Sequence, residues 1–194
     1  MLKRFEIMAY GRFFNIRMLN TIALAICLFA AFQTGYAQFT IGGNASSLGS
    51  GCYRLTPASN SQAGYVYYNT PLNLHHPFDY RFRVYLGTNN GGADGICFVL
   101  RGTLGTPYIG TGGGGIGFLN LSGSNVGGTI GVEVDTYQNG NYGDPTYDHI
   151  AINSQGSPDH TASTALTSIV QASPSNANVE DGKNHTLNIR WNPT

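Results

Sequence analysis

Short runs of alternating apolar and polar residues recur along most of the chain. In the clearest run, 80–86, Phe82, Val84 and Leu86 share one face and two arginines lie on the other. A period of two residues predicts a strand with one buried face. Similar runs predict further strands at 52–55, 64–68, 95–100, 116–119, 129–137, 149–153 and 185–191.

Turn-forming residues separate these runs, and no stretch after residue 37 shows the period of a helix. The chain has 194 residues, of which 27 are Gly and only 10% are charged. No linker or internal repeat divides it. We therefore predict one all-β domain, an antiparallel jelly-roll β-sandwich whose polar loops gather at the ends of the sheets.

The first 37 residues have the layout of a signal peptide. Four basic residues precede residue 18, the run 22–32 is apolar, and Ala37 offers a small residue for cleavage before Gln38. The apolar run is shorter than the ~20 residues that span a bilayer, so we expect no membrane anchor. The sequence predicts that residues 1–37 are removed on export. The mature domain, 38–194, would then be secreted or held at the cell surface.

Removal of this segment would leave the domain slightly acidic. Six basic and nine acidic residues follow residue 37, and the basic ones are scattered rather than grouped. Binding to nucleic acid requires a basic surface. Nucleic acid is therefore not expected as a partner.

Two cysteines, Cys52 and Cys97, remain in the mature domain. An oxidising compartment permits a disulfide between them. The alternative is two separate buried thiols, because Cys97 lies in an apolar run where a free cysteine also packs well.

The richest chemistry lies between residues 133 and 149. Residues two apart in a strand share a face, so Glu133 and Asp135 point one way while Val132 and Val134 point into the core. Two adjacent carboxylates repel each other unless a positive charge lies between them. The pair therefore predicts a bound cation.

The loop after these carboxylates supplies further metal ligands. Asn139 offers a neutral oxygen, Asp144 a carboxylate and His149 an imidazole nitrogen. Calcium prefers about six to eight oxygen ligands, whereas a mixed carboxylate and imidazole set suits a transition ion such as manganese (Mn²⁺). One loop could thus hold a Ca²⁺ ion and a transition ion side by side.

Two other interpretations of the segment remain open. A polar hairpin loop capped by Asn, Asp and Gly is common in all-β proteins. Paired carboxylates on one strand also occur in glycoside hydrolases built on a related sandwich. Those enzymes resemble Glu-x-Asp-x-x-Glu, and here Gln138 occupies the last position, where it cannot act as an acid or a base.

The segment resembles the metal-binding loop of the L-type, or legume-like, lectins. Their pattern is Glu-x-Asp-x-Tyr/Phe-x-Asn followed by Asp and His, and each position is filled here at the expected spacing. The resemblance implies the concanavalin A-like sandwich and two bound ions. The implied ligands are Glu133, Asp135, Asp144 and His149 for the transition ion, and Asp135, the backbone carbonyl of Tyr137, Asn139 and Asp144 for calcium.

Two more segments match this family in the same order. Residues 92–98 are similar to its Ala-Asp-Gly segment, which implies that Asp94 follows a cis peptide and accepts hydrogen bonds from sugar hydroxyls. In the family, bound calcium supports that peptide. Residues 113–118 are similar to its glycine loop, which implies that the Gly114 N–H donates to the same sugar.

Two further kinds of group would complete a sugar site. The amide of Asn139 can both donate to and accept from hydroxyls. An aromatic ring usually covers the C–H face of a sugar. From position alone, Tyr137 is the first candidate for this ring and Tyr142 the second.

The resemblance thus implies an exported lectin, not an enzyme, that binds cell-surface glycans through calcium and a transition ion. Affinity for one sugar is expected to be weak, so homo-oligomers or additional domains would strengthen binding through multivalency. The resemblance runs from Phe39 to Trp191, whereas the family continues with more strands, so we expect a sandwich that is incomplete at its C-terminus and a longer gene product. The alternatives are a glycoside hydrolase of the same sandwich class and an adhesion or structural domain that has lost the sugar.

Overall fold

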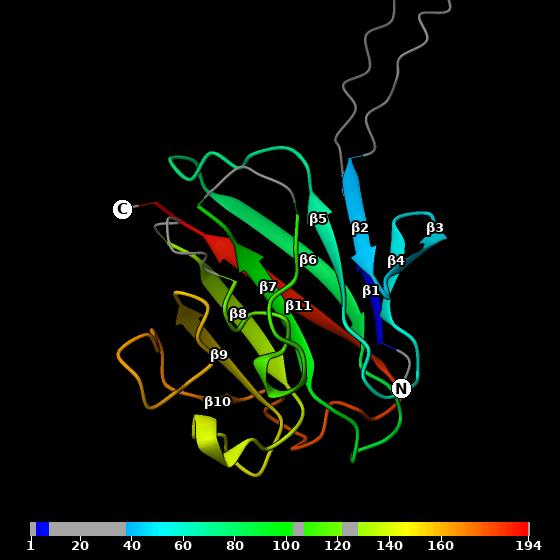
Figure 1. Cartoon of the computed structure of the whole chain (residues 1–194), viewed down its shortest axis with the longest axis vertical. Coiled ribbons are helices and arrows are strands. Elements are labelled where there is room, and N and C mark those ends of the chain that lie inside the picture. The colour runs from blue at the N-terminus through cyan, green and yellow to red at the C-terminus, as the bar shows by residue number, and fades with distance from the viewer. Residues whose placement is uncertain (1–2, 8–37, 103–106, 122–127, 194) are drawn as a thin grey trace, which may run out of the picture.

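Two antiparallel sheets face each other across an apolar core (Figure 1). The structure is a computed structural model that describes residues 3–7, 38–102, 107–121 and 128–193. In these residues one sheet has five strands in the order β11-β6-β1-β4-β3, and the other has four in the order β10-β9-β8-β7. A separate ribbon pairs β2 with β5. The all-β sandwich that the sequence predicts is confirmed.

The elements follow one another in chain order with polar turns between them. The strands are β1 (Lys3–Ile7), β2 (Phe39–Gly43), β3 (Ser46–Gly49), β4 (Cys52–Thr56), β5 (Gly64–Tyr68), β6 (Phe78–Tyr85), β7 (Gly95–Leu100), β8 (Ile130–Asp135), β9 (His149–Ser154), β10 (Val170–Gln171) and β11 (Asn184–Trp191). Two single-turn 3-10 helices are η1 (Gly113–Gly115) and η2 (Gly140–Tyr142).

The core is built from the inward faces of both sheets. On and just after β6, Phe82, Val84 and Leu86 are 6%, 2% and 1% exposed, as their shared face predicts. They belong to one cluster with Ile96 of β7 and Val134 of β8. Each large apolar side chain contributes roughly 1.5–3 kcal/mol when it is buried. This burial decides which face of each strand turns inward.

The prediction of a strand at 116–119 is wrong, whereas the other predicted strands are present. Gly113–Gly115 forms η1, and Ile116 has a φ of 43°, so the chain folds back instead of extending. Glycine makes such a tight turn accessible. The apolar character of the run is explained by Phe118, whose side chain is fully buried in the turn.

Strand β1 lies in the segment that the sequence predicts to be removed. In the uncut chain it pairs with β4 on one side and with β6 on the other, antiparallel to both. The apolar run 22–32 and the expected cleavage position after Ala37 lie outside the described residues. Cleavage stays a prediction, and it would take β1 out of the five-stranded sheet. Within the described residues, no helix has the length and apolar character needed to cross a membrane.

In the structure Cys52 and Cys97 are not joined by a disulfide. Cys52 lies on β4 in the five-stranded sheet, whereas Cys97 lies on β7 in the four-stranded sheet. Burial, helped by Glu133 and Asp135, raises the pKa of the Cys97 thiol well above its ordinary value. A thiol in this state is protonated and unreactive.

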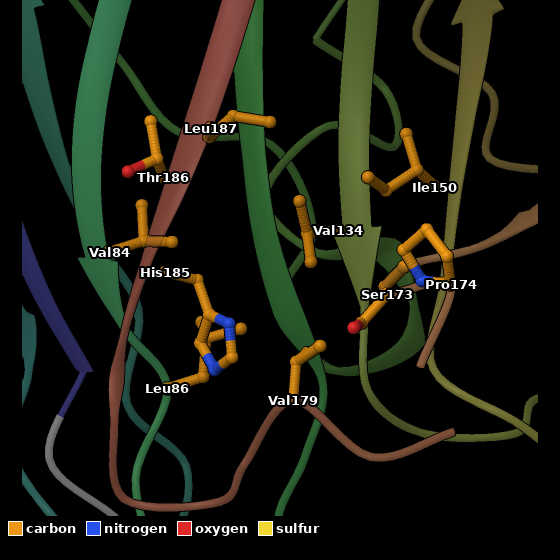
Figure 2. Close-up of a pocket in the computed structure, with 11 residues that line it drawn as sticks. Val84, Leu86, Val134, Ile150, Ser173, Pro174, Val179, His185, Thr186 and Leu187 are labelled. Atoms are coloured by element: carbon orange, nitrogen blue, oxygen red, sulfur yellow. The ribbon is translucent and has the colours of Figure 1, made fainter. Parts of the chain in front are cut away.

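A partly open pocket of about 230 Å³ lies between the two sheets, on the core side of β8 (Figure 2). Val84 and Leu187 line it from the five-stranded sheet, and Val134 lines it from β8. Residues two apart share a face of a strand, so Glu133 and Asp135 lie on the opposite face from Val134. The apolar pocket is therefore distinct from the polar site on the outer face of β8.

Candidate metal and carbohydrate site

Strand β8 presents two acidic side chains on its outer face, and both are buried. Glu133 is 1% exposed and Asp135 is 3% exposed. The sequence predicts this shared face, but it does not predict that loops cover it. Buried carboxylates are costly unless they are paired or bind a metal.

The register of the four-stranded sheet brings distant segments to Asp135. On one side Asp135 lies opposite Gly95 of β7, directly after Asp94, and on the other it lies opposite His149 of β9. The Thr136 N–H donates to the Asp94 carbonyl over 2.8 Å. Segments that are far apart in the sequence therefore meet at one end of this sheet.

The loop between β8 and β9 is held by its own acidic side chains. The Tyr137 N–H donates to Asp135 Oδ1 over 2.8 Å, and the Asn139 N–H donates to Asp144 Oδ2 over 2.7 Å. The backbone then forms η2 before Asp144. These hydrogen bonds fix the directions in which both carboxylates point.

Two groups of side chains have the spacing to hold metal ions. One group is Asp135, Asp144 and His149, and the other is Glu133, His149 and His160. In each group all ligand atoms lie within 4.8 Å of one another. Glu133 Oε2 and Asn139 Oδ1 are buried without a hydrogen-bond partner among the described residues. Buried polar atoms normally have a partner. Both groups share His149, so they describe one mixed carboxylate and imidazole site, which suits a transition ion. The oxygens of Asp135, Asn139 and Asp144 suit calcium. The side chains therefore fit the pair of ions that the resemblance implies.

Burial and crowding disturb the ionisation of the two acids on β8. Burial, together with the charges of Asp144, Glu133 and Asp94, raises the pKa of Asp135 to about 8. Burial also raises the pKa of Glu133. A cation beside these groups would favour their ionised forms and lower both pKa values.

The two histidines of the site shift in opposite directions. Burial lowers the pKa of His149 to about 4, so the ring is neutral, which is the form that binds metals. Burial also acts to lower the pKa of His160, but its hydrogen bonds with Asp144 and Glu133 outweigh burial and raise the pKa to about 9. The proton on His160 thus supplies positive charge among the carboxylates.

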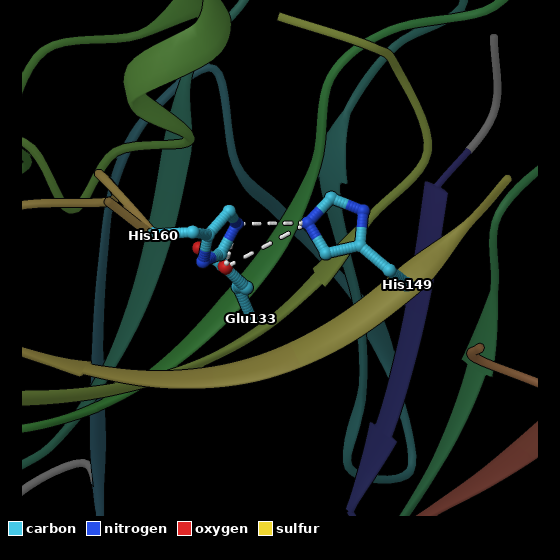
Figure 3. Close-up of side chains that lie close together, drawn as sticks. All are labelled: Glu133, His149 and His160. Atoms are coloured by element: carbon cyan, nitrogen blue, oxygen red, sulfur yellow. Dashed lines mark hydrogen bonds and ion pairs between the residues drawn. The ribbon is translucent and has the colours of Figure 1, made fainter. Parts of the chain in front are cut away.

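Sequence reasoning misses two side chains of this site, His160 and Asn153. His160 Nε2 lies 3.0 Å from Glu133 Oε1 (Figure 3). It belongs to the loop after β9, and no motif or periodicity marks it. Asn153 Nδ2 donates to Glu133 Oε1 over 2.9 Å. Asn153 could have been found, because it shares a face of β9 with His149 at a spacing of four residues.

The predicted sugar-binding groups come to the same end of the sheet. The peptide bond between Ala93 and Asp94 is cis, as the resemblance implies. Gly114 lies against Asn139, since a Cβ added to Gly114 would be 2.7 Å from the Asn139 Cγ. The structure thus places the glycine turn directly on the acidic loop between β8 and β9.

The two tyrosines proposed as a sugar platform differ in exposure. Tyr137 is 48% exposed and lies two residues after the end of β8. Tyr142 is half-buried, and its carbonyl accepts the His160 N–H over 2.9 Å. Tyr137 is therefore the better placed of the two rings.

A jelly-roll sandwich with an acidic loop, a glycine turn and an Asp at one end of a sheet defines a class of carbohydrate-binding proteins. The sequence profile of the legume lectin β-barrel domain matches residues 33–194, and the chain belongs to this family, the L-type lectins. The family and the fold support carbohydrate binding and point to a non-enzymatic protein.

Two proteins illustrate the similarity. The chain is 43% identical over 110 residues to the pesticidal crystal protein Cry22Aa of Bacillus thuringiensis, across 56% of this chain and 13% of that protein. The chain therefore spans only a small part of the length of that relative. Its fold is similar to that of a lectin from Bauhinia forficata in complex with GalNAc, with a TM-score of 0.55, 22% identity, and coverage of 81% of this chain and 79% of the other.

Proposed function

We propose that this domain is an exported lectin whose binding of glycans depends on calcium and a transition ion. The observation that carries the proposal is the convergence of Asp94 and Gly114 on the acidic loop that carries Asn139. These three residues come from three separate segments, and only the folded sheet brings them to one place.

The ions would have a structural task in this site. Asp135, Asn139, Asp144 and the Tyr137 carbonyl would hold calcium, and Glu133, Asp135, Asp144 and His149 would hold the transition ion. Bound cations supply positive charge that compensates the buried carboxylates. With that charge in place, the loop would keep the Asn139 amide in a fixed position beside Gly114.

The sugar would bind through complementary hydrogen bonds. An ionised Asp94 accepts from hydroxyls, the Gly114 N–H donates, and the Asn139 amide can do both. The exposed ring of Tyr137 would cover the C–H face of the sugar. A site of this kind is shallow and binds one sugar weakly, so we expect oligomers or additional domains to add avidity on glycan-covered surfaces.

The buried acids argue against the hydrolase alternative. A general acid and its partner carboxylate must reach the scissile bond. Glu133 and Asp135 are nearly inaccessible, and Asp135 also accepts the Tyr137 N–H. Gln138, at the remaining position of the hydrolase motif, has no acid or base function.

We expect Asp94→Asn to weaken calcium-dependent binding strongly on a glycan array that includes GalNAc, the sugar in the similar Bauhinia lectin complex. A hydrogen bond to a charged group contributes about 1.5–3 kcal/mol, so the loss of the charge should weaken binding by roughly 10- to 100-fold. Gly114→Ala should weaken binding as well, because its Cβ would collide with Asn139. Circular dichroism and thermal melting should show that both variants keep the fold.

Gly140→Ala is the matched control, since a Cβ at Gly140 meets nothing within 4 Å. It should bind glycans like the wild type. A domain that binds Ca²⁺ but no glycan on the array would favour the adhesion or structural alternative. Glycan binding of wild-type strength in Asp94→Asn would show that the sugar site is elsewhere.

Export is a separate prediction, motivated by the basic and apolar pattern of residues 1–37. When the chain is expressed in a host with a general secretory pathway, mass spectrometry of the exported protein should show a chain that begins at Gln38. Ala37→Phe should block cleavage, because the enzyme requires a small residue at this position. Recovery of an uncut wild-type chain from the medium would contradict the prediction.

A further inference from the structure

A second histidine is directed at the transition-ion site. His160 Nε2 lies 3.0 Å from Glu133 Oε1, 3.3 Å from Asp144 Oδ1 and 3.0 Å from His149 Nε2. Figure 3 shows the two imidazole rings meeting beside Glu133. The side chain of His160 is only 4% exposed, and those of Glu133 and His149 are 1% exposed.

These distances are those expected between ligands of one metal ion. Ligand atoms about 2.0–2.1 Å from a metal, at mutual angles of about 90–110°, are about 3 Å apart. The three neighbours of His160 Nε2 lie within about this distance. His149 Nε2 lies 3.9 Å from both Glu133 Oε1 and Asp144 Oδ1, so these pairs would subtend a wider angle at the ion. The neighbours of His160 come from both candidate metal groups. Glu133 belongs to one group, Asp144 to the other, and His149 to both.

The charge on His160 explains its contact with the carboxylates, but it does not account for every neighbour of Nε2. His160 Nε2 carries at most one hydrogen, yet it faces two carboxylate oxygens and a second imidazole nitrogen. Glu133 Oε2 meanwhile stays buried without a partner among the described residues. A metal ion would satisfy several of these atoms together.

The loop that carries His160 is tied to η2 and is stiffened by hydrogen bonds within itself. The His160 N–H donates to the Tyr142 carbonyl over 2.9 Å, which ties the loop to η2. Next to it, the Thr161 N–H and hydroxyl donate to Asp159 Oδ1 over 2.8 and 2.7 Å. These bonds hold the imidazole in place over the acidic pair.

We propose that His160 is a direct ligand of the transition ion, so that the site carries two imidazoles and selects zinc over manganese. The inference rests on the metal binding in the proposed function, but not on sugar binding. Zinc binds most sites more tightly than manganese does, and imidazole suits zinc whereas oxygen ligands suit manganese. A second imidazole should therefore widen the preference for zinc.

The test is titration of the calcium-saturated protein with Zn²⁺ and with Mn²⁺. Loss of an outer-shell partner of a metal ligand costs about 10- to 100-fold in affinity, so loss of a direct ligand in His160→Ala should weaken Zn²⁺ binding at least as much. Affinity for Mn²⁺ should fall less. His160→Asp restores an oxygen ligand, so it should recover Mn²⁺ binding while the preference for Zn²⁺ stays reduced. His76→Ala, at an exposed position, should leave both affinities unchanged.

Copper provides a second readout that does not depend on affinity. Electron paramagnetic resonance of bound Cu²⁺ should show two imidazole nitrogens in the wild type and one in His160→Ala. One nitrogen in the wild type, or an unchanged Zn²⁺ to Mn²⁺ ratio in His160→Ala, would overturn the inference. If calcium-dependent glycan binding is present in either case, the proposed function survives. Two nitrogens without any glycan binding would overturn the lectin proposal alone.

Discussion

Removal of divalent ions should lower the thermal midpoint of the domain and abolish glycan binding together. Three carboxylates, on Glu133, Asp135 and Asp144, are buried at one end of the four-stranded sheet. Ions that bind only the folded state stabilise it by about 4 kcal/mol when their concentration is about 1,000 times the dissociation constant. Differential scanning calorimetry of the chelated and reloaded protein measures this effect.

The control for chelation is selective reloading. Ca²⁺ together with Zn²⁺ or Mn²⁺ should restore both the midpoint and the binding. Mg²⁺ alone should not, because it keeps its water shell and demands a near-ideal octahedron of ligands. A midpoint that is the same with and without chelator would show that the acidic loop holds no structural ion.

Phe118→Ala should be the most destabilising single substitution near the site. Phe118 is fully buried, and its ring lies against β8, where a Cβ added to Gly131 would be 2.8 Å from the Phe118 Cε2. Truncation of a buried Phe costs about 3–5 kcal/mol, a large share of the about 5–15 kcal/mol that stabilises a typical protein. The midpoint of urea denaturation should fall accordingly.

The same substitution should also weaken glycan binding in the fraction that stays folded. The Phe118 N–H donates to the Gly115 carbonyl over 2.8 Å, so Phe118 belongs to the turn that presents Gly114, and its buried ring packs that turn against β8. Leu166→Ala is the matched control, because Leu166 is 53% exposed, and its truncation should change stability by less than about 0.5 kcal/mol. An equal loss of stability in both variants would contradict the proposed anchoring role.

The strands that sequence reasoning recovers are those with one buried face. The run around Phe82 and Val84 alternates because one face meets the opposite sheet. Strand β10 has only two residues, both exposed, and leaves no such pattern. The failure at 116–119 has a different cause, because there the burial of one ring, that of Phe118, produces an apolar run inside a turn.

The residues of the site also divide into those that the sequence predicts and those that it misses. Glu133, Asp135, Asn139, Asp144 and His149 lie close together in the sequence, and the structure brings them close together in space. Asp94 and Gly114 were accessible only through the resemblance, since nothing local links them to that loop. Neither closeness in the sequence nor the resemblance to the lectins marks His160. Its place depends on a loop that folds back onto η2, where the His160 N–H donates to the Tyr142 carbonyl.

The pairing of Gly95 and His149 with Asp135 has a consequence for anyone who prepares this protein. A slip of β7 or β9 by one position would turn every side chain of the slipped strand to the other face. Such molecules would keep their β-sheet content in circular dichroism, yet their acidic groups would be dispersed. With the ions of the proposed function bound, retention of a divalent ion through extensive dialysis should distinguish correctly assembled molecules from misassembled ones, and refolded batches should rank by their metal content.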